Sequence, residues 1–125
     1  MLIKEIIVRS QDAFEKSIQT WAEGNTILFT VFDGKESLTD MADAVVLFHE
    51  NYTISKENDD IKELFSENGK FSHSIDVNGT LMASVSSFIF WLENHKPKNV
   101  LFIGADDITK NEKFIKYLES LTTRL

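Results

Sequence analysis

Five short apolar runs, rich in β-branched and aromatic residues, recur along the chain with helical stretches between them. The runs are residues 2–9, 27–32, 44–48, 71–77 and 99–103. Alternation of this kind is typical of a parallel sheet, because a parallel connection has to cross the sheet and usually does so as a helix. The pattern therefore predicts an α/β fold with a mainly parallel five-stranded sheet and right-handed crossovers.

The length of 125 residues, 42% of them hydrophobic, predicts a single domain over residues 1–125 with one core. Five βα units of this size fit a three-layer, flavodoxin-like sandwich. The alternative is a thioredoxin-like domain, in which residues 37–51 form one long helix. We favour a short helix at 37–43 followed by a strand, because 44–48 is a continuous β-prone run. Pro97 follows a predicted helix, whereas a thioredoxin-like domain usually has a cis-proline before an inner strand.

Short polar residues ahead of the helical stretches predict where helices begin, since their side chains accept hydrogen bonds from the first backbone amides. At one of these places two neighbouring residues are suitable. The candidate caps are Ser10, Asn58 or Asp59, Thr80, and Thr109 with capping-box spacing to Glu112.

The chain has no cysteine, which excludes disulfides and cysteine-ligated zinc and fits a reducing compartment. No charged segment followed by an apolar stretch opens the chain as a signal peptide would. No apolar run approaches the roughly 18 residues that a membrane-spanning helix needs. We therefore expect a cytoplasmic protein that does not bind membranes.

The net charge of -7 is concentrated in one segment. Between Glu36 and Asn68 there are nine acids and two bases, an excess of seven that equals the net charge. Such a field repels nucleic acid and attracts basic proteins. The segment is either a solvated helix face or the binding surface for a basic partner. The residues that would contact such a partner are Glu57, Asp59, Asp60, Glu63 and Glu67.

The stretch from Thr80 to Asn94 is apolar nearly all round the predicted helix. A helix of this kind is either buried or packed against another subunit. Phe90 and Trp91 are therefore candidate contacts in a homodimer, although single exposed aromatic residues are also normal.

Polar and acidic residues follow the apolar runs directly. Ligands bind beyond the carboxyl ends of the strands in open α/β sheets, so these residues mark where a site is expected. The candidate catalytic residues are His49, Glu50 and Asp76. The candidate ligand-binding residues are Asp33, Asn78, Gly79, Thr80, Gly104, Asp106 and Asp107.

The segment Ile75-Asp76-Val77-Asn78-Gly79-Thr80-Leu81 resembles the first motif of the haloacid dehalogenase superfamily, Asp-x-Asp-Gly-Thr-Leu after a strand. The resemblance implies that Asp76 is a phosphoryl-accepting nucleophile that helps to bind Mg²⁺. Residues 100–107 resemble the last acidic motif of that family. Asn78 stands where the family has its general acid/base, and an amide cannot transfer protons. The same segment also suits a strand-end turn that leads into a helix.

Two functions are open at this point, since the chain has no GxGxxG, Walker or Gly-x-Ser-x-Gly motif. The first is a small, acidic, non-catalytic binding or regulatory protein that acts through protein–protein contacts. The second is a small enzyme or ligand-binding protein with a phosphate, nucleotide or Mg²⁺-dependent site at the carboxyl ends of the strands. No cofactor is predicted, except that Mg²⁺ could bind if Asp33, Asp76, Asp106 and Asp107 converge.

Overall fold

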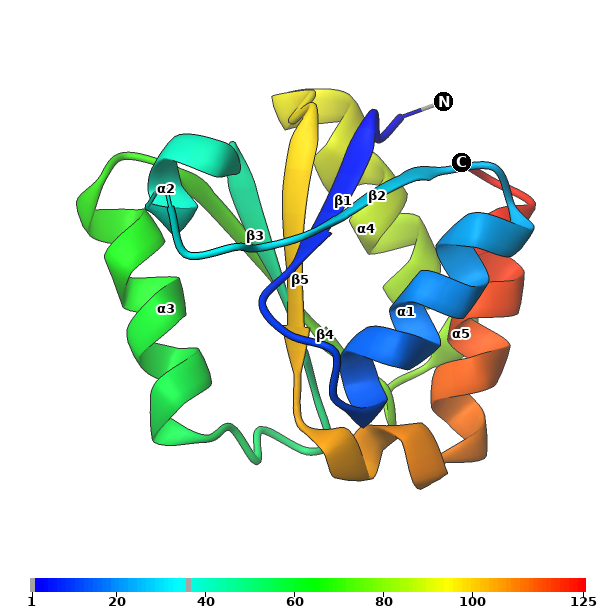
Figure 1. The fold of residues 1–125 in the computed structure, drawn as a ribbon. Helices are drawn as coiled ribbons and strands as arrows, with labels where there is room; N and C mark the ends of the chain where they lie inside the picture. Colours follow the sequence, from blue (N-terminus) through cyan, green and yellow to red (C-terminus); the bar gives the residue numbers. More distant parts are fainter. Residues whose placement is uncertain (1, 36) are drawn as a thin grey trace.

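Five parallel strands form one sheet in the computed structural model, which describes residues 2–35 and 37–125 (Figure 1). Met1 and Glu36, the first acid of the acidic segment, lie outside the described residues. The strands are β1 (Glu5–Val8), β2 (Leu28–Val31), β3 (Ala44–His49), β4 (Phe71–Asp76) and β5 (Asn99–Gly104).

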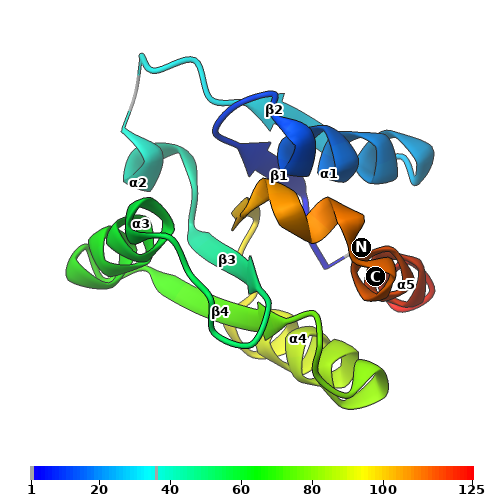
Figure 2. The same cartoon turned by 90° about the horizontal axis from the view of Figure 1, so that it is seen from below.

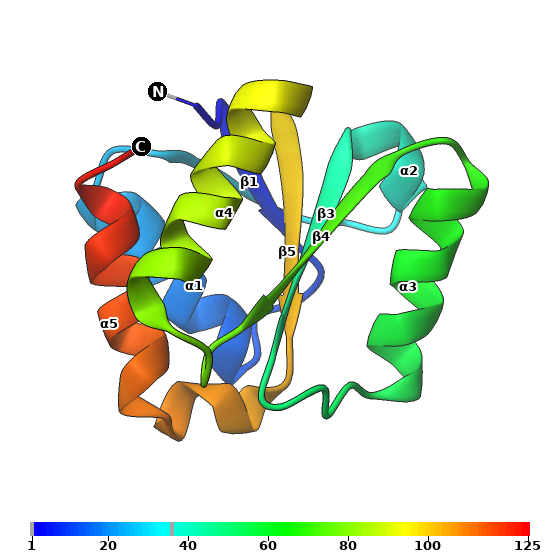
Figure 3. The ribbon, with the colours of Figure 1, turned by 180° about the vertical axis from the view of Figure 1, so that it is seen from behind.

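Helices cover both faces of the sheet (Figure 2). One face carries α1 (Ala13–Gly24), α4 (Leu81–His95) and α5 (Glu112–Thr122), and Figure 3 shows α4 and α5 side by side there. The other face carries α2 (Leu38–Met41) and α3 (Lys56–Glu67). The three-layer α/β sandwich is therefore confirmed. No helix in the described ranges combines the length and the apolar character needed to cross a bilayer.

The strand order is β2-β1-β5-β3-β4, so the last strand of the chain lies at the centre of the sheet. This order differs from the 2-1-3-4-5 order of flavodoxin itself, although the layers are the same. Every residue of β3 is buried, which explains its continuous apolar sequence. The short α2 followed by β3 agrees with the division of residues 37–51 that we favoured over one long helix.

Most of the core lies between the sheet and the face that carries α1, α4 and α5. The ring of Phe48 is at its centre, with ring centroids 5.5–5.8 Å from those of four other aromatic residues, Phe14, Phe102, Phe114 and Tyr117. A smaller cluster, which includes Phe65, lies under α2 and α3. Burial of large side chains on both faces holds the helices against the sheet.

The start of α3 differs from the prediction. Ser55 is the N-cap, and its hydroxyl accepts a hydrogen bond from the backbone N–H of Asn58 at 3.1 Å. Asn58 and Asp59 were the predicted caps, but both lie inside the helix. Asn58 is buried, and its side chain accepts a hydrogen bond from Arg9, directly after β1. The position of Asn58 thus involves a long-range contact, which the local sequence does not show.

Two other caps are also displaced. Asp12 rather than Ser10 precedes α1, and Asn111 rather than Thr109 precedes α5. Asn111 accepts from the backbone N–H of Lys113 at 3.0 Å. Thr80 is the N-cap residue of α4, as predicted, but its side chain makes no capping hydrogen bond. Polar residues close together can each cap a helix, and tertiary packing decides which one does.

Candidate functional site

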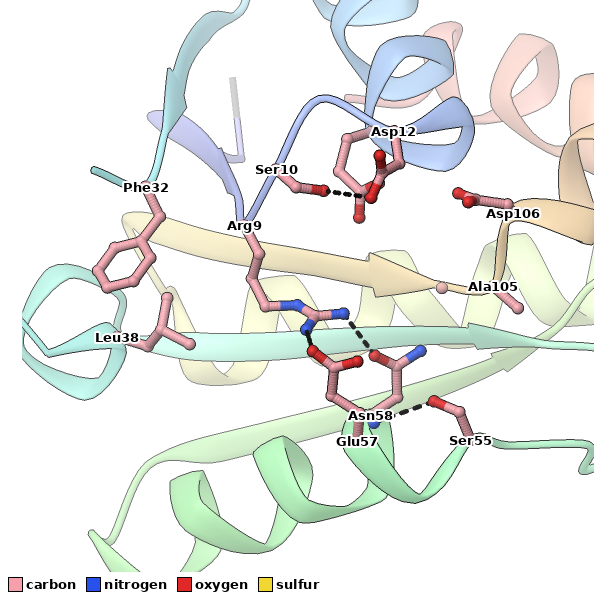
Figure 4. Close-up of a pocket in the computed structure, with 12 residues that line it drawn as sticks. Arg9, Ser10, Asp12, Phe32, Leu38, Ser55, Glu57, Asn58, Ala105 and Asp106 are labelled. Atoms are coloured by element: carbon pink, nitrogen blue, oxygen red, sulfur yellow. Dashed lines mark hydrogen bonds and ion pairs between the residues drawn. The ribbon is translucent and has the colours of Figure 1, made fainter. Parts of the chain in front are cut away.

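A cavity of about 470 Å³ lies at the carboxyl ends of β1 and β5, beside the start of α3 (Figure 4). The chain leaves β1 toward α1 on one face of the sheet and leaves β3 toward α3 on the other. Because β5 lies between these two strands, the two connections diverge around it. Such a divergence opens a crevice, which is where ligands bind in open α/β sheets.

Arg9, directly after β1, extends along one side of the cavity toward α3 (Figure 4). Its Nη1 donates to a carboxylate oxygen of Glu57 and its Nη2 donates to Oδ1 of Asn58 at 2.7 Å. Its Nε is buried and has no hydrogen-bond partner among the described residues. The side chain of Arg9 is 19% exposed and that of Glu57 is 75% exposed. Arg9 therefore links β1 to the start of α3, and its charge is paired.

Three further carboxyl groups surround the start of α1. Asp12 accepts a hydrogen bond from the Ser10 hydroxyl at 3.2 Å. Asp106, which follows β5, accepts from the backbone N–H of Phe14 at 3.0 Å. Glu15 is only 4% exposed and also lines the cavity. These groups make this side of the cavity acidic.

Burial raises the pKa of the Glu15 carboxyl above its usual value, since desolvation disfavours the charged form. Its own backbone N–H, the Ser10 hydroxyl and the charge of Arg9 oppose the rise, and Asp106 adds to it. Glu15 is thus a buried carboxyl group whose ionised form is poorly stabilised by its surroundings.

The cavity also has an apolar wall. Phe32, after β2, and Leu38, at the start of α2, both line it and are partly exposed. Figure 4 shows their side chains close together on the side away from Asp106. A ligand in the cavity would therefore meet carboxylates on one side and hydrocarbon on the other.

Two of the predicted ligand-binding residues, Gly104 and Asp106, line this cavity. Asp107 is exposed in the 3-10 helix η1 (Asp106–Lys110) and is not among the lining residues. Gly79 and Thr80 are exposed after β4, where the N–H of Gly79 donates to the carbonyl of Asp76 at 3.0 Å. That bond closes a strand-end turn, the alternative interpretation of this segment of the sequence.

The candidate catalytic residues His49 and Asp76 do come together, in a second cluster. They are paired in register at the ends of β3 and β4. Oδ1 of Asp76 accepts from the backbone N–H groups of Asn51 and Asn78, at 3.1 and 3.0 Å. Nδ1 of His49 accepts from the backbone N–H of Tyr52 at 3.0 Å. Asn51 and Tyr52 have φ values of 50° and 65°. The two side chains therefore hold a left-handed turn that is otherwise unfavourable.

The remaining members of this second cluster are also hydrogen-bonded. Nδ2 of Asn111 donates to Glu50 at 2.9 Å and to Oδ1 of Asn78 at 2.8 Å. Burial lowers the pKa of His49, Lys62 lowers it further, and Asp76 opposes this. A lowered pKa favours the neutral imidazole, which is the form that can accept the N–H of Tyr52 at Nδ1. None of these residues lines the cavity beside Arg9.

Binding of Mg²⁺ by Asp33, Asp76, Asp106 and Asp107 was conditional on their convergence, and the strand order does not bring all four together. Asp33 follows β2 and Asp76 ends β4, and these strands are opposite edges of the sheet. Four strand spacings separate them, about 19 Å. Asp33 is exposed and accepts from the backbone N–H of Lys35 at 2.9 Å. Within residues 2–35 and 37–125, no three His, Asp or Glu residues are grouped so that they could hold a metal ion.

Arg9, Glu15 and Asn58 were not predicted as site residues from the sequence. Arg9 was recognisable only as the polar residue that ends the predicted strand 2–9. Glu15 and Asn58 lie within helical stretches, where a polar residue is usually solvent-exposed. Their burial depends on how α1 and α3 pack at the end of β5, which the local sequence does not specify.

The acidic residues of α3 have two different environments. Asp59, Asp60, Glu63 and Glu67 are exposed, and Asp60 accepts from Lys56 at 3.2 Å. Glu57 instead pairs with Arg9 at the cavity. The outer face of α3 therefore presents four carboxylates to solvent.

The two aromatic residues proposed for a homodimer also differ. Phe90 is 67% exposed on α4. Trp91 is partly buried, and its ring centroid is 5.3 Å from that of His73 on β4 and 6.0 Å from that of Phe88. Phe90 is thus available to a partner, whereas Trp91 mainly packs within the chain.

The fold is similar to that of a solved structure from Syntrophus aciditrophicus, described as a "putative molybdenum carrier protein". The TM-score is 0.67, and the similarity covers 97% of this chain and 95% of that chain. At 14% sequence identity the similarity supports a shared fold. No family model and no curated protein sequence matches this chain.

Proposed function

We propose that this protein binds a small molecule in the cavity beside Arg9. The observation that carries the proposal is the position of the cavity, where α1 and α3 leave the sheet on opposite faces. Its volume of about 470 Å³ lies within the usual range for small-molecule sites. It also combines an apolar wall with a few polar groups, as such sites commonly do.

The description of the Syntrophus protein makes molybdenum one ligand to test. In neutral water molybdenum is present as the oxyanion molybdate. A site that binds an oxyanion needs hydrogen-bond donors and positive charge. Here the guanidinium of Arg9 is paired with Glu57, and the N–H of Phe14 is bonded to Asp106. These contacts favour a ligand of different charge, so molybdate serves as one member of a broader panel.

The test is a binding screen against a variant in which the cavity is filled. The panel contains molybdate, phosphate, nucleosides, nucleotides, sugars and organic amines, and binding is measured by thermal shift and by amide chemical shifts. We expect at least one ligand to stabilise the protein, since a ligand that prefers the folded state raises Tm. Its largest chemical-shift changes should be at Ala105 and Asp106.

Ala105 is exposed at the cavity, so Ala105→Trp should block binding. Ala83→Trp places the same side chain at an exposed position of α4 that does not line the cavity, and should leave binding unchanged. The proposal would be contradicted if no ligand of the panel bound to Ala83→Trp and failed to bind to Ala105→Trp.

A second candidate function is the binding of a basic protein to the outer face of α3. The supporting observation is the row of exposed carboxylates at Asp59, Asp60, Glu63 and Glu67. Attraction of this kind weakens as salt rises. The proposal requires a purified complex with a basic protein that dissociates at high salt.

Charge-reversal variants test whether the partner binds to this surface or responds only to the net charge of the whole protein. Replacing Asp60, Glu63 and Glu67 by lysine should abolish the complex. Replacing the exposed acids Glu93, Glu112 and Glu119 by lysine changes the net charge equally and should leave the complex intact. Equal loss in both variants would show that α3 is not the contact surface.

A further inference from the structure

We infer that the ligand of the cavity beside Arg9 is an organic cation, with an ammonium group next to the carboxylates and an apolar part against Phe32 and Leu38. This inference rests on the proposed function, because it names the chemical class that the same cavity would take. It goes further in predicting that charge determines which ligands bind.

The charges that line the cavity favour a cation. Four carboxyl groups and one guanidinium line it, and the guanidinium of Arg9 is already bonded to Glu57. The other three carboxyl groups, from Asp12, Glu15 and Asp106, stand near the start of α1. The helix dipole offsets part of this negative charge, but its effect is smaller than a full charge. An ammonium group would therefore be attracted and an anion repelled.

The usual anion-binding arrangement at a helix start is already occupied here. Backbone N–H groups at the beginning of a helix commonly bind phosphate or carboxylate. In this protein the N–H of Phe14 donates to the side chain of Asp106, so the protein supplies its own anion at that position. A phosphate in the cavity would have to displace Asp106 and would also lie near Asp12 and Glu15.

The burial of Glu15 is a further indication of a cationic ligand. Its side chain lines the cavity although the residue is only 4% exposed. The nearby Ser10 hydroxyl donates to Asp12, and Arg9 donates to Glu57 and Asn58. A buried carboxylate without a strong partner is unfavourable, and the raised pKa of Glu15 agrees with this. An ammonium group in the cavity would supply the missing partner.

The apolar wall indicates what else the ligand carries. Phe32 and Leu38 are partly exposed at the cavity, on a different side from Asp106 (Figure 4). Hydrocarbon placed against them would leave water, which is favourable. An aromatic or alkyl amine satisfies both sides of the cavity, whereas a small inorganic cation satisfies only one.

Three ligands of nearly the same shape test the inference: phenethylamine, 2-phenylethanol and phenylacetate. They carry a cation, a neutral hydroxyl and an anion on the same aromatic group. Binding is followed by the amide chemical shifts of Ala105 and Asp106. We expect phenethylamine to bind at least about tenfold more tightly than the other two, as a charge-assisted hydrogen bond is worth more than a neutral one.

Glu15→Gln should reduce the affinity for phenethylamine by about tenfold or more, since the amide keeps the shape and loses the charge. Glu23→Gln is the matched control on the exposed part of α1, and should leave the affinity unchanged. If Glu15→Gln does not fold, Asp12→Asn, at an exposed position of the same cavity, provides the same comparison.

The outcomes separate the two proposals. The cation inference would be overturned if the alcohol or the acid bound more tightly than the amine. It would also be overturned if Glu15→Gln or Asp12→Asn left the affinity for the amine unchanged. In both cases the cavity would remain a binding site. The same holds if no amine of the broad panel binds at Ala105 and a neutral or anionic ligand of that panel does. Failure of all three probes and of the whole panel would overturn the proposed function as well.

Discussion

The backbone of Gly104 lies directly against the ring of Phe14. A Cβ at position 104 would be 2.6 Å from Cε2 of Phe14, which is closer than such atoms can approach. Because Gly104 ends β5 and Phe14 belongs to the first turn of α1, this contact sets the distance between helix and sheet at the edge of the cavity. The positions of Glu15 and Asp106 depend on it.

Gly104→Ala should therefore destabilise the protein by about 1–3 kcal/mol, the usual cost of overpacking a core. Phe14 is fully buried, and its ring centroid is 5.7 Å from that of Phe48 and 5.6 Å from that of Phe114, so a shift of the ring would disturb these contacts. Urea denaturation gives the free energy of unfolding. Gly24→Ala is the control, because a Cβ there meets nothing within 4 Å, and it should be neutral or slightly stabilising. Equal stability of the two variants would mean that the Phe14 contact is not restrictive.

Asp76 tests whether the second cluster is a structural feature. Asp76→Ala should lower stability by about 1–3 kcal/mol, because the backbone N–H groups of Asn51 and Asn78 lose their shared acceptor. Asp76→Asn keeps an oxygen at Oδ1 and should lose less. Hydrogen exchange at the two amides measures the effect directly, and it should be faster in the alanine variant.

The role implied by the resemblance to haloacid dehalogenases predicts a different result for Asp76. A carboxylate that acts as a nucleophile cannot be replaced by an amide, so Asp76→Asn would abolish any phosphoryl-transfer activity while leaving the fold intact. Unchanged hydrogen exchange at Asn51 in Asp76→Ala would contradict the structural role.

The positions of the strands were predictable because the central strands are buried on both faces and therefore have continuous apolar sequences. Residues 44–48 show this most clearly, since every residue of β3 is buried. The length of that run also separated α2 from β3. Local sequence was therefore sufficient for the strands, the α-helices and their approximate bounds, but it did not show the 3-10 helix η1.

The order of the strands was not predictable in the same way. It depends on which face each helix packs against, and all five helical stretches have an apolar side. The central position of β5 brings Asp106 beside the start of α1 and places Asp33 and Asp76 at opposite edges. The cavity lies at the ends of strands, where a site was expected, but Arg9 and Glu15 line it and Asp33 and Asp76 do not.

The burial of the His73 ring predicts that the protein becomes less stable in acid. The ring lies 5.4 Å from that of Phe88 and 5.3 Å from that of Trp91, and burial lowers its pKa from 6.5 to about 4. Between these pH values the unfolded chain binds a proton at His73 and the folded chain does not. Stability should therefore fall as the pH drops from 6.5 to 4. His73→Phe keeps an aromatic ring at this position and should reduce this fall.

Urea denaturation from pH 7 to pH 4 measures the effect, with His95→Phe as the control because His95 is exposed on α4. Part of the fall should persist in His73→Phe, because burial also lowers the pKa of His49. An identical pH dependence in His73→Phe and the unaltered protein would contradict the prediction.

Phe90 tests the homodimer. Since its side chain is 67% exposed, Phe90→Glu should change the stability of the folded chain by no more than about 0.5 kcal/mol. If α4 forms the contact between two copies, light scattering should show a dimer for the unaltered protein and a monomer for Phe90→Glu. Leu64→Glu, at an exposed position of α3 on the other face of the sheet, controls for added charge. The same mass for the unaltered protein and Phe90→Glu would remove the proposal.

The burial of the Glu15 carboxylate in the cavity predicts that this residue lowers the stability of the protein. Burial raises the pKa of Glu15 above 4.5. Between pH 4.5 and this raised pKa the folded chain holds a proton that the unfolded chain has lost, so stability falls as the pH rises. Glu15→Gln removes the ionisation and keeps the size, so it should increase stability at pH 7 by about 1 kcal/mol. The gain should shrink toward pH 4 and be absent in Glu23→Gln, as urea denaturation at each pH would show. If Glu15→Gln is instead less stable at pH 7, the carboxylate has a favourable partner within the chain, and a cationic ligand is no longer needed to account for its burial.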